Sequence, residues 1–112
     1  MGSYNKEVRH YLTPAGRDPY QAWLESLRDL QGKIAIVRRV DRLEIGNPGD
    51  HAFCREGVWE LRIDHGPGYR VHYGTDGHRI VLLLGGGDKD SQARDIERAV
   101  AAWRDYEQRK HA

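Results

Sequence analysis

Two short segments in the second half of the chain alternate between polar and apolar residues. Residues 59–64 read Trp-Glu-Leu-Arg-Ile-Asp, and residues 69–73 read Tyr-Arg-Val-His-Tyr. Successive side chains of a strand point to opposite faces, so this pattern predicts two neighbouring strands that bury one aromatic and aliphatic face. The other face carries charged residues, including Arg62 and Arg70. The planar guanidinium group suits phosphate oxygens, and we therefore expect the functional surface on this polar face.

The first half of the chain predicts two helices. Asp18 is placed as an N-cap, with Pro19 at the first helical position, and Gly32 is expected to end this helix and begin a second one. Residues 46–49 (Gly-Asn-Pro-Gly) stop the second helix. A connection this short predicts that the two helices form an antiparallel hairpin, whose outer edge is basic.

The remaining segments complete a single α+β domain over residues 1–112. Strands are predicted at residues 4–12, 51–55, 58–64, 69–74 and 79–84, and a last helix at residues 91–108. The apolar run at residues 80–84 predicts a strand at the centre of the sheet, ended by three glycines. The order βααββββα then predicts an antiparallel sheet packed against the N-terminal helical hairpin and the C-terminal helix.

Composition narrows the class of protein. A chain of 112 residues with 38% hydrophobic content has enough apolar surface for one modest core. The single cysteine, Cys54, excludes an internal disulfide and is expected to be a half-buried strand residue. The chain contains no apolar run long enough for a membrane span and no signal-like start, so we expect a cytoplasmic protein. A net charge of +1 does not by itself indicate nucleic-acid binding.

Several ordered motifs resemble one known family. They are Glu-Leu-Arg-Ile at 60–63, Gly-Pro-Gly-Tyr-Arg-Val at 66–71 and Gly-Gly-Asp-Lys-x-x-Gln at 86–92, and the similarity runs from about Pro19 to Trp103. Together they resemble the RelE/ParE superfamily of bacterial toxins, and most of all its HigB-like addiction module killer branch. The resemblance implies a RelE-like fold, a cognate antitoxin as partner in a toxin–antitoxin hetero-oligomer, and activity on messenger RNA bound to the ribosome.

Three basic residues are the leading site candidates: Arg62, Arg70 and Lys89. From the residues alone, the two arginines on adjacent strands either share one phosphate or form ion pairs with Glu60 and Asp64. The resemblance favours the first reading, because basic residues at the matching positions serve RNA cleavage in ribosome-dependent members of the family. It implies that Arg70 binds the reacting phosphate and that Arg62 supports Arg70. Lys89 would position the RNA or protonate the leaving oxygen.

The proton acceptor is predicted to be Glu60 or His72. Glu60 stands where the known RNA-cutting relatives have a lysine, and residues 92–95 lack the tyrosine found near this point in those relatives. Tyr73 is predicted to be a core residue by its parity in the strand. The spacing of the six histidines gives no metal-ligand set, and the glycine run does not match a phosphate-binding loop, so neither metal nor cofactor is expected.

Three functions are consistent with these observations. The leading one is a type II toxin that acts as a metal-independent mRNA endonuclease, in which a ribose 2′-hydroxyl attacks the adjacent phosphate. The second is a ParE-like inhibitor of DNA gyrase without nuclease activity, and the third is a non-catalytic protein-binding module. Gyrase inhibitors of the family generally lack the set formed by Arg62, Arg70 and Lys89, which favours the first.

Overall fold

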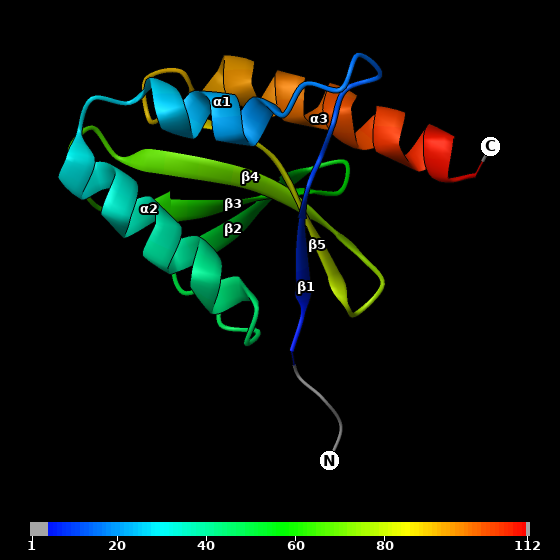
Figure 1. The fold of residues 1–112 in the computed structure, drawn as a ribbon, viewed down its shortest axis with the longest axis horizontal. Coiled ribbons are helices and arrows are strands. Elements are labelled where there is room, and N and C mark those ends of the chain that lie inside the picture. The colour runs from blue at the N-terminus through cyan, green and yellow to red at the C-terminus, as the bar shows by residue number, and fades with distance from the viewer. Residues whose placement is uncertain (1–4, 112) are drawn as a thin grey trace.

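The computed structural model describes residues 5–111 and confirms the α+β class (Figure 1). The described residues form five strands and three helices: β1 (Glu7–His10), α1 (Pro19–Ser26), α2 (Leu30–Leu43), β2 (His51–Arg55), β3 (Val58–Ile63), β4 (Tyr69–Asp76), β5 (Ile80–Asp88) and α3 (Gln92–Lys110). The first strand is shorter than the predicted range of 4–12, and Tyr4 lies outside the described residues.

The sheet is mixed, so the prediction of an antiparallel sheet is wrong at one edge. The strands lie in the order β1-β5-β4-β3-β2, and the pairs from β2 to β5 are antiparallel. β1 runs parallel to β5, with Glu7 opposite Ile80. No tight turn joins these two strands, so the sequence pattern contains nothing that sets their relative direction. The centre of the sheet is β4 rather than the apolar strand β5.

Helices cover both faces of the sheet and bury two separate hydrophobic clusters. α1 and α2 lie on one face, where the cluster includes Ile36, Leu61 and Val71. α3 lies on the other face, over Val58 and Leu82. The predicted alternation in β3 and β4 is confirmed, because their apolar positions enter the first cluster: Leu61, Ile63, Tyr69, Val71 and Tyr73. The polar positions of both strands therefore point to the α3 side.

The two N-terminal helices do not form the predicted hairpin. Asp18 caps α1 as expected, and its carboxylate accepts a hydrogen bond from the Gln21 backbone N–H. α2, however, begins at Leu30 with Asp29 as N-cap, so Gly32 lies inside this helix and does not separate the two. α1 packs mainly on β5 whereas α2 packs on β3 and β4, and Figure 1 shows them diverging over the sheet.

Gly32 is required by packing. A Cβ atom at this position would lie 2.7 Å from the Tyr69 ring and 2.6 Å from the Asp29 carboxylate. The glycine therefore lets α2 approach the start of β4 closely. A glycine in a helical pattern marks either the end of a helix or a close contact with a neighbouring element. Gly32 is of the second kind.

β5 continues through its three glycines to Asp88, so the prediction that they end the strand is wrong. They bring neighbouring elements close to the strand backbone. A Cβ atom at Gly86 would lie 2.3 Å from the Trp23 ring of α1, and one at Gly87 would overlap the Asp95 carboxylate of α3. The register with β4 shifts between His72 and Tyr73. The end of β5 is thus held between two helices.

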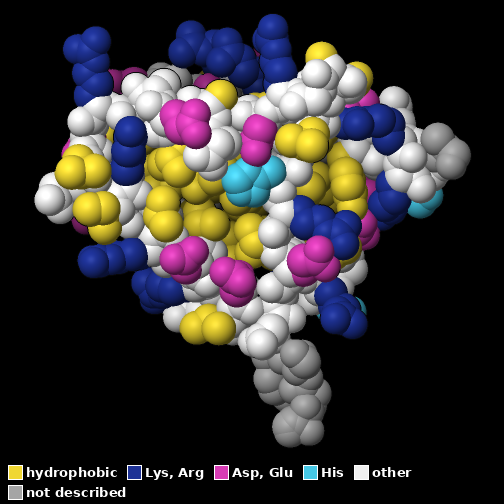
Figure 2. Space-filling view, in the orientation of Figure 1, with side chains coloured by type: hydrophobic (Ala, Val, Ile, Leu, Met, Phe, Trp, Pro, Cys, Tyr) yellow, Lys and Arg dark blue, Asp and Glu magenta, His cyan; other side chains and the backbone are white. Residues whose placement is uncertain are grey.

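The face with α1 and α2 remains partly open. Figure 2 shows hydrophobic side chains in the middle of this face, where the two helices leave part of the sheet uncovered. Large exposed hydrophobic residues of the described chain lie on and beyond α2, among them Leu30, Ile34, Val37 and Ile45.

Two neighbouring glycines test the packing at the end of β5. We expect Gly86→Ala to lower the free energy of unfolding by about 1–3 kcal/mol, because the new methyl group overlaps the Trp23 ring. Gly85→Ala is the matched control, since a Cβ atom there meets no heavy atom within 4 Å. Urea unfolding of both variants measures the difference. Equal stability of the two would show that Trp23 does not limit this position.

Candidate functional site

The predicted basic residues meet at one end of the sheet, on the α3 side. Arg62 near the end of β3 and Arg70 at the start of β4 are direct cross-strand partners. Lys89 directly follows β5. All three line a hollow of about 390 Å³, together with Asp50, Asp64 and the glycine-proline turn at residues 66–68. The structure therefore brings together the basic set that the sequence predicts.

A tight turn between β5 and α3 presents Lys89 to solvent. The Asp88 carboxylate accepts hydrogen bonds from the backbone N–H groups of Asp90 and Ser91. These hydrogen bonds join the residue before Lys89 to the two residues after it and so stabilise the turn. The Lys89 ammonium makes no ion pair or hydrogen bond with any residue of the described chain, and its side chain is exposed. Its charge is available to an anion in the hollow.

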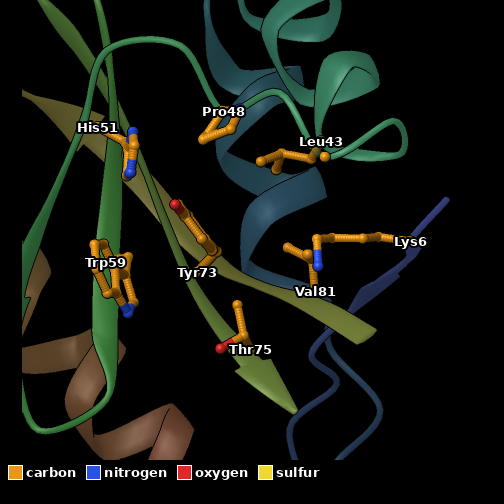
Figure 3. Close-up of a pocket in the computed structure, with 9 residues that line it drawn as sticks. Lys6, Leu43, Pro48, His51, Trp59, Tyr73, Thr75 and Val81 are labelled. Atoms are coloured by element: carbon orange, nitrogen blue, oxygen red, sulfur yellow. The ribbon is translucent and has the colours of Figure 1, made fainter. Parts of the chain in front are cut away.

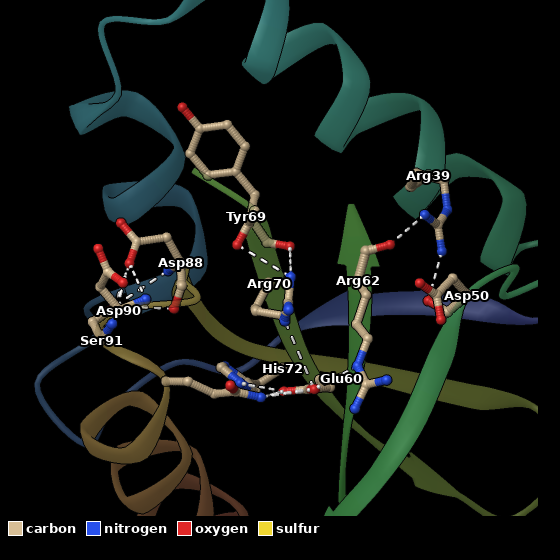
Figure 4. A network of polar contacts seen from close by, with 12 residues as sticks. Arg39, Asp50, Glu60, Arg62, Tyr69, Arg70, His72, Asp88, Asp90 and Ser91 are labelled. Carbon is tan, nitrogen blue, oxygen red and sulfur yellow. Dashed lines mark hydrogen bonds and ion pairs between the residues drawn. The ribbon is translucent and has the colours of Figure 1, made fainter. Parts of the chain in front are cut away.

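Glu60 lies beneath the two arginines at the centre of a polar network (Figure 4). Arg62 Nε donates a hydrogen bond to Glu60 Oε2 at 3.0 Å, and Arg70 Nε lies 3.8 Å from the same oxygen. Gln92 in the first turn of α3 donates to both carboxylate oxygens at 2.9 Å. His72 Nε2 lies 3.5 Å from Glu60 Oε1. One carboxylate thus contacts side chains of β3, β4 and α3.

The surroundings of Glu60 favour its ionised form. Burial raises the pKa of this carboxyl, but the contacts with His72, Arg62 and Gln92 outweigh that effect and lower the pKa to about 2. Glu60 is therefore a carboxylate at neutral pH. Its single negative charge is paired with two positive guanidinium groups, those of Arg62 and Arg70. The three groups together therefore carry a net positive charge.

The prediction that Glu60 and His72 lie on an open polar face is wrong. Glu60 is 1% exposed and His72 is fully buried, because the start of α3 covers this part of the sheet. The side chain of Arg62, by contrast, is 44% exposed and that of Arg70 14%. The arginines form the accessible layer, and the carboxylate and the imidazole lie underneath.

The sequence left two interpretations of Arg62 and Arg70 open, phosphate binding and ion pairing with Glu60 and Asp64. Glu60 forms ion pairs with both arginines, whereas Asp64 forms none. These ion pairs do not neutralise both arginines, because one carboxylate pairs with two guanidinium groups. Arg70 in addition has a buried Nε without a hydrogen-bond partner, while its Nη1 donates to backbone carbonyls of residues 68 and 69. The guanidinium groups remain able to bind an anion.

Tyr73 belongs to the opposite face. It is 4% exposed, and burial raises its pKa to about 12. It lines a separate, mostly apolar hollow of about 250 Å³, which Trp59, Val81 and Leu43 also line (Figure 3). The prediction that Tyr73 is a core residue is confirmed. Cys54 is half-buried as predicted, and burial raises the pKa of its thiol to about 11.

Sequence reasoning assigned no role to Gln92, Asp50 or Arg39. Gln92 ends the Gly-Gly-Asp-Lys-x-x-Gln motif, which was the available signal for its contact with Glu60. Arg39 of α2 donates to the backbone carbonyls of Arg62 and Asp50 and so braces the edge of the hollow. These contacts join segments that are distant along the chain, and no local pattern indicates them.

No helix within residues 5–111 is long and apolar enough to span a membrane. Nor does this part of the chain hold a cluster of three or more His, Cys, Asp or Glu side chains placed to bind a metal ion.

This chain is similar to proteins of one known family. The family model of phage-derived Gp49-like proteins matches residues 22–106, which include the whole hollow. An uncharacterised protein of Haemophilus influenzae is 44% identical over 80 residues, covering 71% of this chain and 81% of that protein.

Glu60→Gln tests the role of the buried carboxylate. We expect a loss of about 2 kcal/mol in the free energy of unfolding at neutral pH, because the neutral amide is a weaker acceptor for Arg62 and Gln92. Since the pKa of Glu60 is lowered from 4.5 to about 2, the stabilisation is fully present above pH 4.5 and is lost as the pH falls through about 2. The difference between wild type and variant should therefore shrink in acid.

Glu97→Gln is the control, because Glu97 is exposed and has no partner in the described chain. Urea unfolding between pH 2 and 7 measures both variants. A Glu60→Gln protein as stable as the Glu97→Gln protein at pH 7 would contradict a structural role for the network.

Proposed function

This chain belongs to the family of phage-derived Gp49-like proteins, a family of the RelE toxin type, and from this we propose that it is the toxin of a type II toxin–antitoxin pair that cleaves messenger RNA on the ribosome, as HigB-like toxins do. The observation that supports cleavage is the hollow in which Arg62, Arg70 and Lys89 converge. Family membership also suggests an antitoxin as partner.

The proposed reaction is an attack of a ribose 2′-hydroxyl on the adjacent phosphate. The 2′ oxygen forms a new bond to phosphorus, the bond to the 5′ oxygen breaks, and the products are a 2′,3′-cyclic phosphate and a 5′-hydroxyl. Negative charge grows on the phosphate oxygens in the transition state, and donors placed in advance stabilise it. Arg70 is the proposed phosphate clamp, and Arg62 supports it from the neighbouring strand.

Lys89 is proposed to serve the leaving group. Its ammonium is exposed at the mouth of the hollow, without a partner in the described chain. From there it donates a proton to, or forms a hydrogen bond with, the departing 5′ oxygen. Glu60 acts in this proposal as a positioning residue, because it holds both arginines from below.

We propose Asp64 as the acceptor of the 2′ proton. Glu60 and His72, the acceptors expected from sequence, lie beneath the arginine layer, out of reach of a substrate hydroxyl in this geometry. Asp64 is exposed, lines the same hollow as Arg62 and Arg70, and makes no ion pair or hydrogen bond with a described residue. Its carboxylate is therefore free to accept a proton.

Arg70→Ala is the decisive variant. We expect it to abolish growth inhibition and to slow cleavage of messenger RNA in a purified translation system by roughly 10²–10³-fold, the usual cost of removing a donor to the transition state. Arg55→Ala is the control, because Arg55 is the exposed last residue of β2 and pairs with Val58, at the end of β3 away from the hollow. Circular dichroism confirms folding of both variants.

The same expression experiment separates the alternatives. Cuts within translated messages, with protein synthesis stopping first, support the nuclease. Arrest of replication with linearised DNA would instead identify a gyrase inhibitor, and harmless overproduction of a folded protein would leave a binding module. Toxicity that Arg70→Ala does not reduce would exclude Arg70 from the mechanism.

Asp64→Asn tests the proton acceptor. We expect cleavage to slow by about 10²–10⁴-fold while RNA binding persists, because the amide cannot accept the proton but keeps the size of the side chain. Asp90→Asn, which changes another exposed acid in the turn beside Lys89, is the control. Single-turnover cleavage of labelled messenger RNA bound to ribosomes measures both. If Asp64→Asn cleaves RNA at the wild-type rate, Asp64 is not the proton acceptor.

A further inference from the structure

α2 carries three arginines within five residues. Arg38 and Arg42 are four residues apart and so project from one side of the helix, both exposed. Arg39 lies next to them, between that side and the sheet. We call these three residues the α2 arginine strip. The buried side of the helix is formed by other positions, namely Ile36, Val40 and Leu43.

Arg39 connects the strip to the edge of the hollow (Figure 4). Its Nη1 donates to the backbone carbonyl of Arg62 at 2.6 Å, and its Nη2 donates to the carbonyls of Pro48 at 2.7 Å and Asp50 at 2.9 Å. Arg62 and Asp50 both line the hollow. Arg39 thus links α2 directly to two residues at the edge of the hollow.

The positive charge of the strip is not matched by ion pairs. None of its three guanidinium groups lies within 4.0 Å of a carboxylate of the described chain. Asp41 is three residues from Arg38, a spacing that permits an ion pair, yet the two form none. Arg42 has arginines three and four residues before it, and like charges at this spacing destabilise a helix.

Burial and the neighbouring Arg42 both act on Arg39. Burial lowers the pKa of its guanidinium, and the charge of Arg42 lowers it further, with partial compensation from Asp50. An anion bound across Arg38 and Arg42 would relieve the repulsion. The backbone of a nucleic acid offers such anions at regular spacing.

We propose that the α2 arginine strip is a second phosphate-binding site, which holds the RNA backbone flanking the nucleotides in the hollow. The inference rests on the proposed function for the identity of the nucleic acid. Arg38 and Arg42 bind phosphates directly, and Arg39 keeps α2 fixed against the end of β3. Such contacts read no bases, so the strip contributes affinity and orientation without sequence preference.

The test is RNA binding by Arg38→Ala/Arg42→Ala. Fluorescence anisotropy is measured with 20-nucleotide single strands of two unrelated sequences, with every 2′-hydroxyl methylated so that no cleavage occurs. We expect weaker binding to both strands. The slope of log K against log salt should become shallower by about 1.4, because each lost single-strand phosphate contact removes about 0.7.

Arg55→Ala/Arg79→Ala is the matched control. Arg55 is the last residue of β2 and Arg79 lies in the turn before β5; both are exposed and lie at the opposite end of the sheet from the hollow, and the variant removes the same charge. We expect it to keep the wild-type slope. Alanine is a good helix former, so α2 should stay folded in Arg38→Ala/Arg42→Ala, and circular dichroism checks the folding of both variants.

The outcomes separate this inference from the proposed function. A wild-type slope in Arg38→Ala/Arg42→Ala, or an equal loss in the control, would overturn the second site. Because the strands cannot be cleaved, a protein that binds them through the strip but never cuts unmodified RNA would overturn only the nuclease. A wild-type protein that binds neither strand would overturn the second site but not the proposed cleavage of messenger RNA on the ribosome.

Discussion

The buried carboxylate of Glu60 sets the geometry of the functional end of this molecule. Removing a carboxylate from water costs several kcal/mol unless charged groups and donors surround it. Here Arg62 from the same strand, Arg70 from β4 and Gln92 from α3 meet that requirement. Three elements must therefore converge at one point. The arginines that face solvent are held from beneath by a group that does not face solvent itself.

The glycines of β5 let helices on both faces of the sheet approach this end of the strand closely. Without side chains at Gly86 and Gly87, Trp23 of α1 and Asp95 of α3 lie directly against the strand backbone. The first turn of α3 then reaches far enough over the sheet for Gln92 to contact Glu60. The hollow is thus placed where β3 ends, β4 begins and β5 runs into α3.

Much of this arrangement follows from local sequence patterns. The features that were not predicted have one cause in common, which is that they depend on contacts with distant residues. Strand parity correctly predicted that Arg62 and Arg70 share a face, and the Asp18-Pro19 pair predicted the start of α1. Gly32 was misread because a glycine looks the same in sequence whether it ends a helix or admits a ring against it. The direction of β1 was missed because its partner lies some seventy residues away, beyond any turn signal.

The sequence alone determined which side chains belong to each face of β3 and β4, since the period of a strand depends only on backbone geometry. It also determined that three basic groups fall near the ends of neighbouring segments. Only the tertiary structure decided which groups on the polar face stay accessible. α3 covers Glu60 and His72 and leaves Arg62 and Lys89 open, because burial depends on where a distant helix packs.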